Sequence, residues 1–149
     1  ADGKVIGKDV DYLPDAGIIL ETPGFIGYYS GMKNLQVLAG IRHRINQKQI
    51  RETMETVGLD PDLRLPVKKY SLGMRQRLGI AQAIMEKPDI LLLDEPMNGL
   101  DEQGVTDMRT LFLSLKENGV TILLASHNTE DIALLCDNVY RIDGGKIHI

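Results

Sequence analysis

Cysteines, basic clusters and long apolar runs are scarce in this sequence of 149 residues. The single cysteine, Cys136, cannot form an internal disulfide, which fits a reducing, cytosolic compartment. A net charge of −4, with no run of lysine or arginine, argues against a nucleic-acid partner. The longest apolar runs, 90–93 and 122–125, are far shorter than the roughly 20 residues that cross a bilayer. Any membrane-spanning part must therefore belong to another segment or polypeptide.

The composition is ordinary for one globular domain, since 43% of residues are apolar and 26% are charged. The apolar pattern predicts strands at 5–6, 17–21, 90–93 and 120–125, the last two buried, and a hairpin over 139–149. It predicts helical faces at Leu35/Leu38/Ile41/Ile45, Ile50/Met54/Val57, Met74/Leu78/Ala81/Met85 and Val105/Met108/Leu111/Phe112/Leu115, and a short helix through Leu135. Strands that alternate with helices predict a parallel sheet with covered faces. The expected fold class is α/β, with a helical part near 25–87 between core parts 1–24 and 88–149.

Two acids follow directly on the apolar strand 90–93. Strand ends at the carboxyl edge of an open α/β sheet are where such sheets bind ligands. There Asp94 could hold Mg²⁺ through water, and Glu95 could orient or deprotonate an attacking water. The alternative is a strand that runs into a solvated turn.

Residues 71–76, Ser-Leu-Gly-Met-Arg-Gln, begin the third predicted helix. A serine at a helix N-terminus followed by glycine offers a hydroxyl and free backbone N–H groups to an anion. Taken alone, Ser71 is better explained as an ordinary N-cap, and it is the spacing to the two acids that favours an anion site. His127 follows the strand 120–125, and alternating strands should bring it to the same sheet edge as the two acids, where a neutral imidazole could reach a phosphate. His43 and His148 have no such context and are expected on the surface.

In this order, these segments resemble the ABC ATPase family. Its signature motif matches 71–76, its Walker B strand 90–95, its D-loop 99–101 and its switch histidine His127. The resemblance covers essentially the whole chain, and the ordered occurrence of four motifs makes it specific. Leu72, where most members have glycine, and Glu21, in place of the Q-loop glutamine, look like bacterial drug and peptide-antibiotic exporters of the bacitracin type. For Glu21, a plain strand-end acid remains an alternative.

The sequence contains no Gly-x-x-x-x-Gly-Lys-Ser/Thr segment and lacks the family's adenine-stacking aromatic residue. Without that loop there is no backbone cradle for the β-phosphate. Residues 1–10 instead resemble the family stretch just after the P-loop helix. We therefore expect a natural protein that extends N-terminally, an incomplete P-loop NTPase core sheet, and a proteolytic or deliberate fragment that is inactive alone.

The resemblance implies ATP and Mg²⁺ as ligands, with Asp94 and Glu21 at the metal, and Glu95 as general base with His127 as the second catalytic residue. Ser71, Leu72, Gly73 and Met74 would bind in trans the ATP held by a second ATPase domain, and Asp101 would couple the two sites. The implied function is ATP hydrolysis that drives export through a separate permease, at the inner face of a bacterial membrane.

Residues Thr22–Lys33 mix glycine and proline with aromatics rather than repeating at helical spacing, which favours a partner surface for the permease. The alternative is that these aromatics pack under the helical part. Two other functions stay open: an ABC-type ATPase of translation or DNA repair, and an interaction module whose site has decayed. In the family, the P-loop strand lies beside the strand that ends at His127. Without it, 120–125 should have a bare edge that a second copy, another segment of this chain or water satisfies; we favour a second copy.

Overall fold

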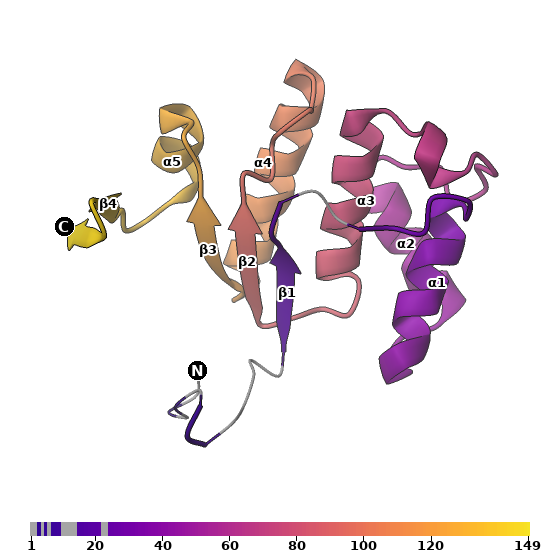
Figure 1. Cartoon of the computed structure of the whole chain (residues 1–149), viewed down its shortest axis with the longest axis horizontal. Helices are drawn as coiled ribbons and strands as arrows, with labels where there is room; N and C mark the ends of the chain where they lie inside the picture. Colours follow the sequence, from indigo (N-terminus) through magenta and orange to yellow (C-terminus); the bar gives the residue numbers. More distant parts are fainter. Residues whose placement is uncertain (1–2, 4, 6, 10–14, 22–23) are drawn as a thin grey trace.

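A computed structural model describes residues 3, 5, 7–9, 15–21 and 24–149 of the chain (Figure 1). Its elements in chain order are strand β1 (Ala16–Ile19), helices α1 (Gly31–Arg42) and α2 (Gln47–Thr56), a 3₁₀ turn (Val67–Lys69), helix α3 (Leu72–Ile84), strand β2 (Ile90–Asp94), helix α4 (Glu102–Glu117), strand β3 (Thr121–Ala125), helix α5 (Thr129–Leu135), and strands β4 (Arg141–Asp143) and β5 (Lys146–His148). Among the described residues, none of the helices has the length and apolar character needed to cross a bilayer.

The central sheet is parallel and has the order β1–β2–β3. In this register Leu91 of β2 lies opposite Gly17 on one side and Ile122 on the other. The predicted α/β class with a parallel sheet is confirmed. Because all three strands run the same way, their carboxyl ends meet at one edge of the sheet (Figure 1).

One face of the sheet carries the core. Helix α4 lies behind β2 and β3 in Figure 1, and its Met108 and Phe112 are buried together with Leu91 and Leu93. Helix α3 approaches β1 so closely that a Cβ atom at Gly17 would lie 1.9 Å from the Ala83 carbonyl oxygen. Glycine at position 17 is therefore what permits the helix to lie directly on the strand.

The opposite face is bare, so the prediction of covered faces is wrong for the part of the chain that the structure describes. Ile18 is 46% exposed and Leu123 is 65% exposed, although both side chains are apolar. Strand β3 alternates between exposed and half-buried residues and is not the buried strand that its composition predicts. It pairs with β2 alone, so its outer edge has no partner strand among the described residues, as expected for 120–125.

Each of the helices α1, α2 and α3 of the helical part begins at a residue whose side chain caps it. The Ser30, Asn46 and Ser71 side chains accept from the backbone N–H three residues later, and at Asn46 a capping box is complete. The predicted face of Ile50, Met54 and Val57 is confirmed as core. The prediction for α1 is partly wrong, since Ile41 is 73% exposed. Ile45 lies beyond the helix, because His43 adopts a left-handed conformation that ends α1.

The two ends of the chain differ from each other. Val5 is not in a strand: its N–H and carbonyl both bond to Asp9 in a local turn, so the strand predicted at 5–6 is wrong at this residue, and Ile6 lies outside the described residues. At the other end the predicted hairpin is confirmed. Strands β4 and β5 pair across Gly144 and Gly145, which both have positive φ.

Candidate functional site

The carboxyl edge of the sheet brings together the acids and the histidine that the sequence singles out. Asp94 is the last residue of β2 and lies opposite Ala125, the last residue of β3. Glu95 continues from β2, and its N–H donates to the Ala125 carbonyl oxygen at 2.9 Å. His127 stands two residues beyond β3, so all three side chains belong to adjacent strand ends.

Glu95 and His127 are in direct contact. The Glu95 carboxylate accepts a hydrogen bond from the His127 backbone N–H at 2.8 Å, and the same oxygen lies against Nδ1 of the imidazole ring. Glu95 has a positive φ of 45°, a strained conformation for a residue with a side chain. Its side chain is 26% exposed, whereas that of His127 is 99% exposed. The pair therefore presents a carboxylate held by the fold and an imidazole open to solvent.

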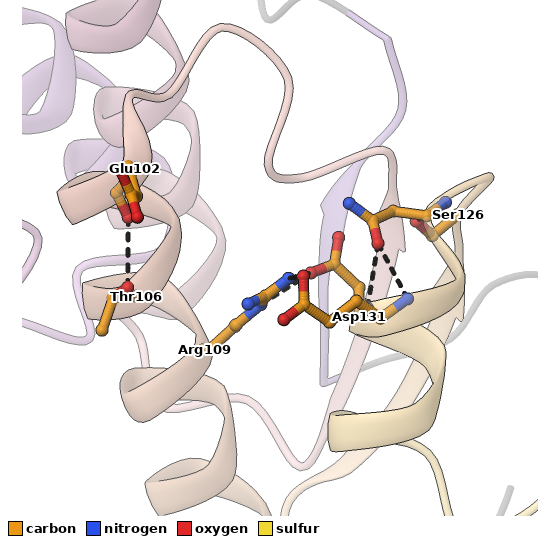
Figure 2. A network of polar contacts seen from close by, with 7 residues as sticks. Glu102, Thr106, Arg109, Ser126 and Asp131 are labelled. Carbon is orange, nitrogen blue, oxygen red and sulfur yellow. Dashed lines mark hydrogen bonds and ion pairs between the residues drawn. The ribbon is translucent and has the colours of Figure 1, made fainter.

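A second network fixes the helix that follows His127 (Figure 2). The Arg109 Nε on α4 donates to the Asp131 carboxylate on α5 at 2.7 Å, and the Arg109 guanidinium also reaches Glu130 at 3.2 Å. Asp131 is only 2% exposed. Asn128 caps α5 by accepting from the Glu130 and Asp131 N–H groups. These bonds anchor the loop that carries His127 to the core helix α4.

The predicted anion site at the start of α3 is exposed. Ser71 is its N-cap, and Ser71 Oγ accepts from the Met74 N–H at 3.1 Å, which leaves its own proton free to donate to an anion. The first N–H groups of an α-helix have no acceptor within the helix, so those of Leu72 and Gly73 are further donors at the same end. Leu72 is 57% exposed, and Met74 is half-buried against the core.

The start of α3 packs against the turn that follows the two acids. A Cβ atom at Gly73 would lie 3.0 Å from the Gly99 carbonyl oxygen, and one at Gly99 would lie 2.4 Å from Leu72 Cγ. Gln76, which is 6% exposed, donates through Nε2 to the Pro96 carbonyl oxygen at 2.9 Å. Ser71–Gln76 and 94–100 therefore form one packed unit within the chain.

Asp101 and Glu21 are the remaining predicted site residues. Asp101 is the N-cap of α4, where its Oδ1 accepts from the Gly104 N–H at 2.9 Å, so it has a structural role in the chain itself. Glu21 is exposed with a φ of 57°, two residues past the end of β1 and at the same sheet edge as Asp94.

The donor set at this edge fits a magnesium ion that is shared with a nucleotide. In the described part of the chain, no three His, Cys, Asp or Glu side chains come together as a metal site. Mg²⁺ in phosphate-transfer sites needs only one or two carboxylates, because phosphates and water supply its other ligands. A pocket of about 260 Å³ between α1, α3 and the start of β1 opens at the opposite edge and is unrelated to these residues.

The loop before α1 exposes aromatic side chains. Tyr28 is 73% exposed and packs edge-to-face on Tyr29, with the ring centroids 4.8 Å apart. Ile26 is 36% exposed, whereas Phe25 is half-buried against the core. Of the predicted partner segment Thr22–Lys33, residues 22 and 23 lie outside the described residues. The alternative that all these aromatics pack under the helical part is wrong for Tyr28.

Three buried polar residues hold these segments in place, and none of the motifs in the sequence predicts this role. Asn34 on α1, Gln76 on α3 and Asp131 on α5 are polar and buried, at 3%, 6% and 2% exposure. Each satisfies its polar atoms by bonds to residues on other elements or loops, which periodicity does not reveal. In the sequence, such a residue could be recognised only as a polar residue on an otherwise apolar helix face.

Comparison with known proteins identifies the chain's relatives. Residues 5–98 match the model of the family described as ABC transporter. Over 145 residues the chain is 41% identical to YybJ, an uncharacterised ABC transporter ATP-binding protein of Bacillus subtilis (strain 168), covering 97% of this chain and 66% of that protein. It is 45% identical over 122 residues to BcrA, a bacitracin transport ATP-binding protein of Enterococcus faecalis, covering 81% of this chain and 40% of that protein. The chain thus spans only part of the length of each relative.

Solved structures show the same fold. The dimeric ABC transporter cassette MJ0796 superposes with a TM-score of 0.72 at 20% identity, over 80% of this chain and 55% of that one. A post-hydrolysis state of MJ0796 bound to ADP and Pi superposes with a TM-score of 0.71 at 21% identity. At this identity the similarity concerns the fold alone, and it agrees with the predicted P-loop NTPase class.

Proposed function

Because this chain belongs to the ABC transporter family, whose model matches residues 5–98, we propose that it forms most of the ATP-hydrolysing domain of a subunit that drives export through a separate membrane permease. The observation that carries the proposal is the contact between Glu95 and His127 at the end of the strand that bears Asp94. The transported molecule would be a drug or peptide antibiotic, since one relative is named a bacitracin transport protein and another, from Streptococcus pyogenes, a lantibiotic transport protein.

Each residue at the sheet edge has a separate task. Asp94, with Glu21 nearby along the edge, would hold Mg²⁺, which neutralises phosphate charge when it is bound. Glu95 would orient the attacking water and accept its proton, because its carboxylate is already fixed by the His127 N–H. His127, with an exposed ring, would contact the terminal phosphate as phosphoryl transfer proceeds.

The start of α3 would act on a nucleotide held by a second ATPase domain. Ser71, Leu72, Gly73 and Met74 would form this site. The Ser71 hydroxyl and the Leu72 and Gly73 N–H groups would be its donors, because the Met74 N–H already bonds to Ser71 Oγ. Without a phosphate-binding loop, such an anion site would bind ATP only weakly. Two domains would therefore have to close on each ATP. Asp101, at the end of the turn packed under this site, would link its position to that of the acids.

Residues outside this sequence would supply the phosphate-binding loop. The unpartnered edge of β3 and the exposed Ile18, Leu20 and Leu123 form an apolar surface that a further strand and helix would cover. A second copy that fills this edge is the alternative, and it would make a dimer that ATP does not control.

The permease would bind on Thr22–Lys33, where Ile26 and Tyr28 are exposed on a loop. A subunit docked on a permease in this way would lie at the inner face of the bacterial cell membrane. The ABC-type ATPases of translation and DNA repair remain a second candidate function, but no side-chain arrangement described above favours them.

Calorimetry with Mg-ATP tests the division of the site. The chain alone should not bind in the low micromolar range, a free energy of about −8 kcal/mol, because it has one weak side of the pocket. The same chain joined to a phosphate-binding loop should bind ATP. Low-micromolar binding by the chain alone would mean that the primary site lies elsewhere.

A further inference from the structure

Two segments that are distant in sequence lie side by side behind the exposed aromatics. The Val67 N–H donates to the Tyr29 carbonyl oxygen, and the Lys68 N–H donates to the Gly27 carbonyl oxygen, both at 2.9 Å. Ser30 and Pro66 form an antiparallel bridge between the same segments. These contacts join residues 26–31 and 66–70 into one unit, called here the paired strap.

The first half of the strap is fixed to α1 by Asn34. Its Nδ2 donates to the Ile26 and Ser30 carbonyl oxygens at 3.1 and 3.0 Å, and its Oδ1 accepts from the Ile26 N–H at 2.8 Å. Asn34 is 3% exposed, so these bonds are shielded from water. A partner that binds Ile26 and Tyr28 therefore acts on an ordered segment.

The second half of the strap ends at Tyr70, which is 5% exposed. The Tyr70 hydroxyl accepts a hydrogen bond from the Gly31 N–H at 3.2 Å. A Cβ atom at position 31 would lie 2.5 Å from that oxygen, so the contact requires glycine there. The Tyr70 N–H donates to the Val67 carbonyl oxygen at 2.9 Å, which closes the 3₁₀ turn directly before the next residue.

That next residue is Ser71, the N-cap of α3. Arg75, one turn into α3, donates through its guanidinium to the Lys68 carbonyl oxygen at 3.0 Å and so ties the turn back to the helix. Hydrogen bonds and adjacent backbone therefore connect residues 26–31 through Tyr70 to Ser71.

We propose that Tyr70 is a positioning residue that couples the exposed Tyr28 surface to the anion site at Ser71. The inference rests on the proposed function, because it needs ATP bound against Ser71. A partner on the loop changes the placement of Ser71, and ATP held at Ser71 changes the environment of Tyr28. Thermodynamic linkage makes the two effects reciprocal, so either direction can be measured.

The nucleotide direction needs no permease. The experiment uses the chain joined to its phosphate-binding loop, with Tyr28→Trp as a fluorescent reporter, since this sequence has no tryptophan. A non-hydrolysable ATP analogue with Mg²⁺ should change the emission of the introduced tryptophan. Tyr70→Phe keeps the ring but removes the acceptor for the Gly31 N–H. The emission change should fall about twofold or more in this variant, measured at nucleotide concentrations that calorimetry shows to saturate each protein.

A disulfide across the strap provides a rescue. A Cβ atom at Gly27 would lie 3.4 Å from the Lys68 Cβ, close to the spacing of about 3.5–4.5 Å found in disulfides. In the Tyr70→Phe background with Cys136→Ala, oxidation of a Gly27→Cys/Lys68→Cys pair should restore the emission change, and reduction should remove it. The single Lys68→Cys variant, which cannot close the bridge, is the matched control.

The outcomes separate the coupling from the function. Loss in Tyr70→Phe with rescue on oxidation supports the positioning role. An undiminished emission change in Tyr70→Phe, or a loss that oxidation does not restore, overturns it while the proposed function stands. If the parent protein binds no nucleotide, the proposed function fails and the coupling fails with it.

Discussion

At Gly17 the C-terminal part of helix α3 lies directly on strand β1, and alanine there tests this close packing. The new Cβ would lie 1.9 Å from the Ala83 carbonyl oxygen and 2.7 Å from Leu91 Cδ2. A carbon and an oxygen that are not bonded lie at least about 3.3 Å apart, so α3 must withdraw by more than about 1 Å. Overpacking a core costs about 1–3 kcal/mol, and here the obstacle is backbone, so we expect about 3 kcal/mol.

Thermal and urea unfolding of the chain, followed by far-UV circular dichroism, measures this loss. For a domain of this size, about 3 kcal/mol corresponds to a fall in Tm of about 6–12 °C. Gly40→Ala is the matched control, because Gly40 is an exposed residue of α1 with nothing within 4 Å of an added Cβ. It should raise stability by about 0.5–1 kcal/mol, since alanine favours helix. A Gly17→Ala variant as stable as the parent would refute the close approach of α3 to β1.

Three further predictions follow from buried or crowded groups. Burial raises the pKa of Tyr70 above its ordinary value of about 10. The contribution of the neutral hydroxyl to folding stability is therefore fully present below about pH 10, and it is lost as the pH rises through the higher pKa of the folded state. Urea midpoints should therefore fall less between about pH 9 and 11 in Tyr70→Phe than in the parent, and equal falls would contradict this. Gly73→Asp should abolish ATPase activity in the complete protein, because it places a negative charge at the anion site. Gly73→Ala introduces the same Cβ, 3.0 Å from the Gly99 carbonyl oxygen, without the charge and should retain more activity. Equal losses of activity in the two variants would show that the charge is not the cause. Asp131→Asn weakens the pairing with Arg109, so amide exchange in α5 should accelerate, and unchanged exchange would count against that anchor.

Local signals predicted much of this fold. Ser71 begins α3 because its side chain satisfies the Met74 N–H, and the β4–β5 hairpin forms where Gly144 and Gly145 permit positive φ. The same holds for β2, whose apolar run ends at two acids. These features depend on residues within a few positions of one another, so a single sequence contains the information.

Non-local features were predicted less well. Apolar composition at 120–125 indicates burial, but Leu123 is exposed because nothing in the described chain covers that face. Ile41 is exposed although it lies within α1, and Ile45 lies beyond the helix because a left-handed His43 ends it. The contact between Glu95 and His127 could be expected from strand order, whereas the Tyr70–Gly31 bond, made across distant segments, could not.

The proposed function depends above all on Glu95 as the base that activates water for ATP hydrolysis. The direct measurement is a comparison of Mg-ATP binding and single-turnover hydrolysis between Glu95→Gln and the parent, in the chain joined to its phosphate-binding loop. Glutamine keeps the shape and can still accept from the His127 N–H, but it cannot take a proton from water. We expect unchanged ATP affinity, with hydrolysis reduced by about 10²–10⁴-fold in Glu95→Gln. Hydrolysis at the parental rate in Glu95→Gln would contradict it and leave Glu95 as a structural acid.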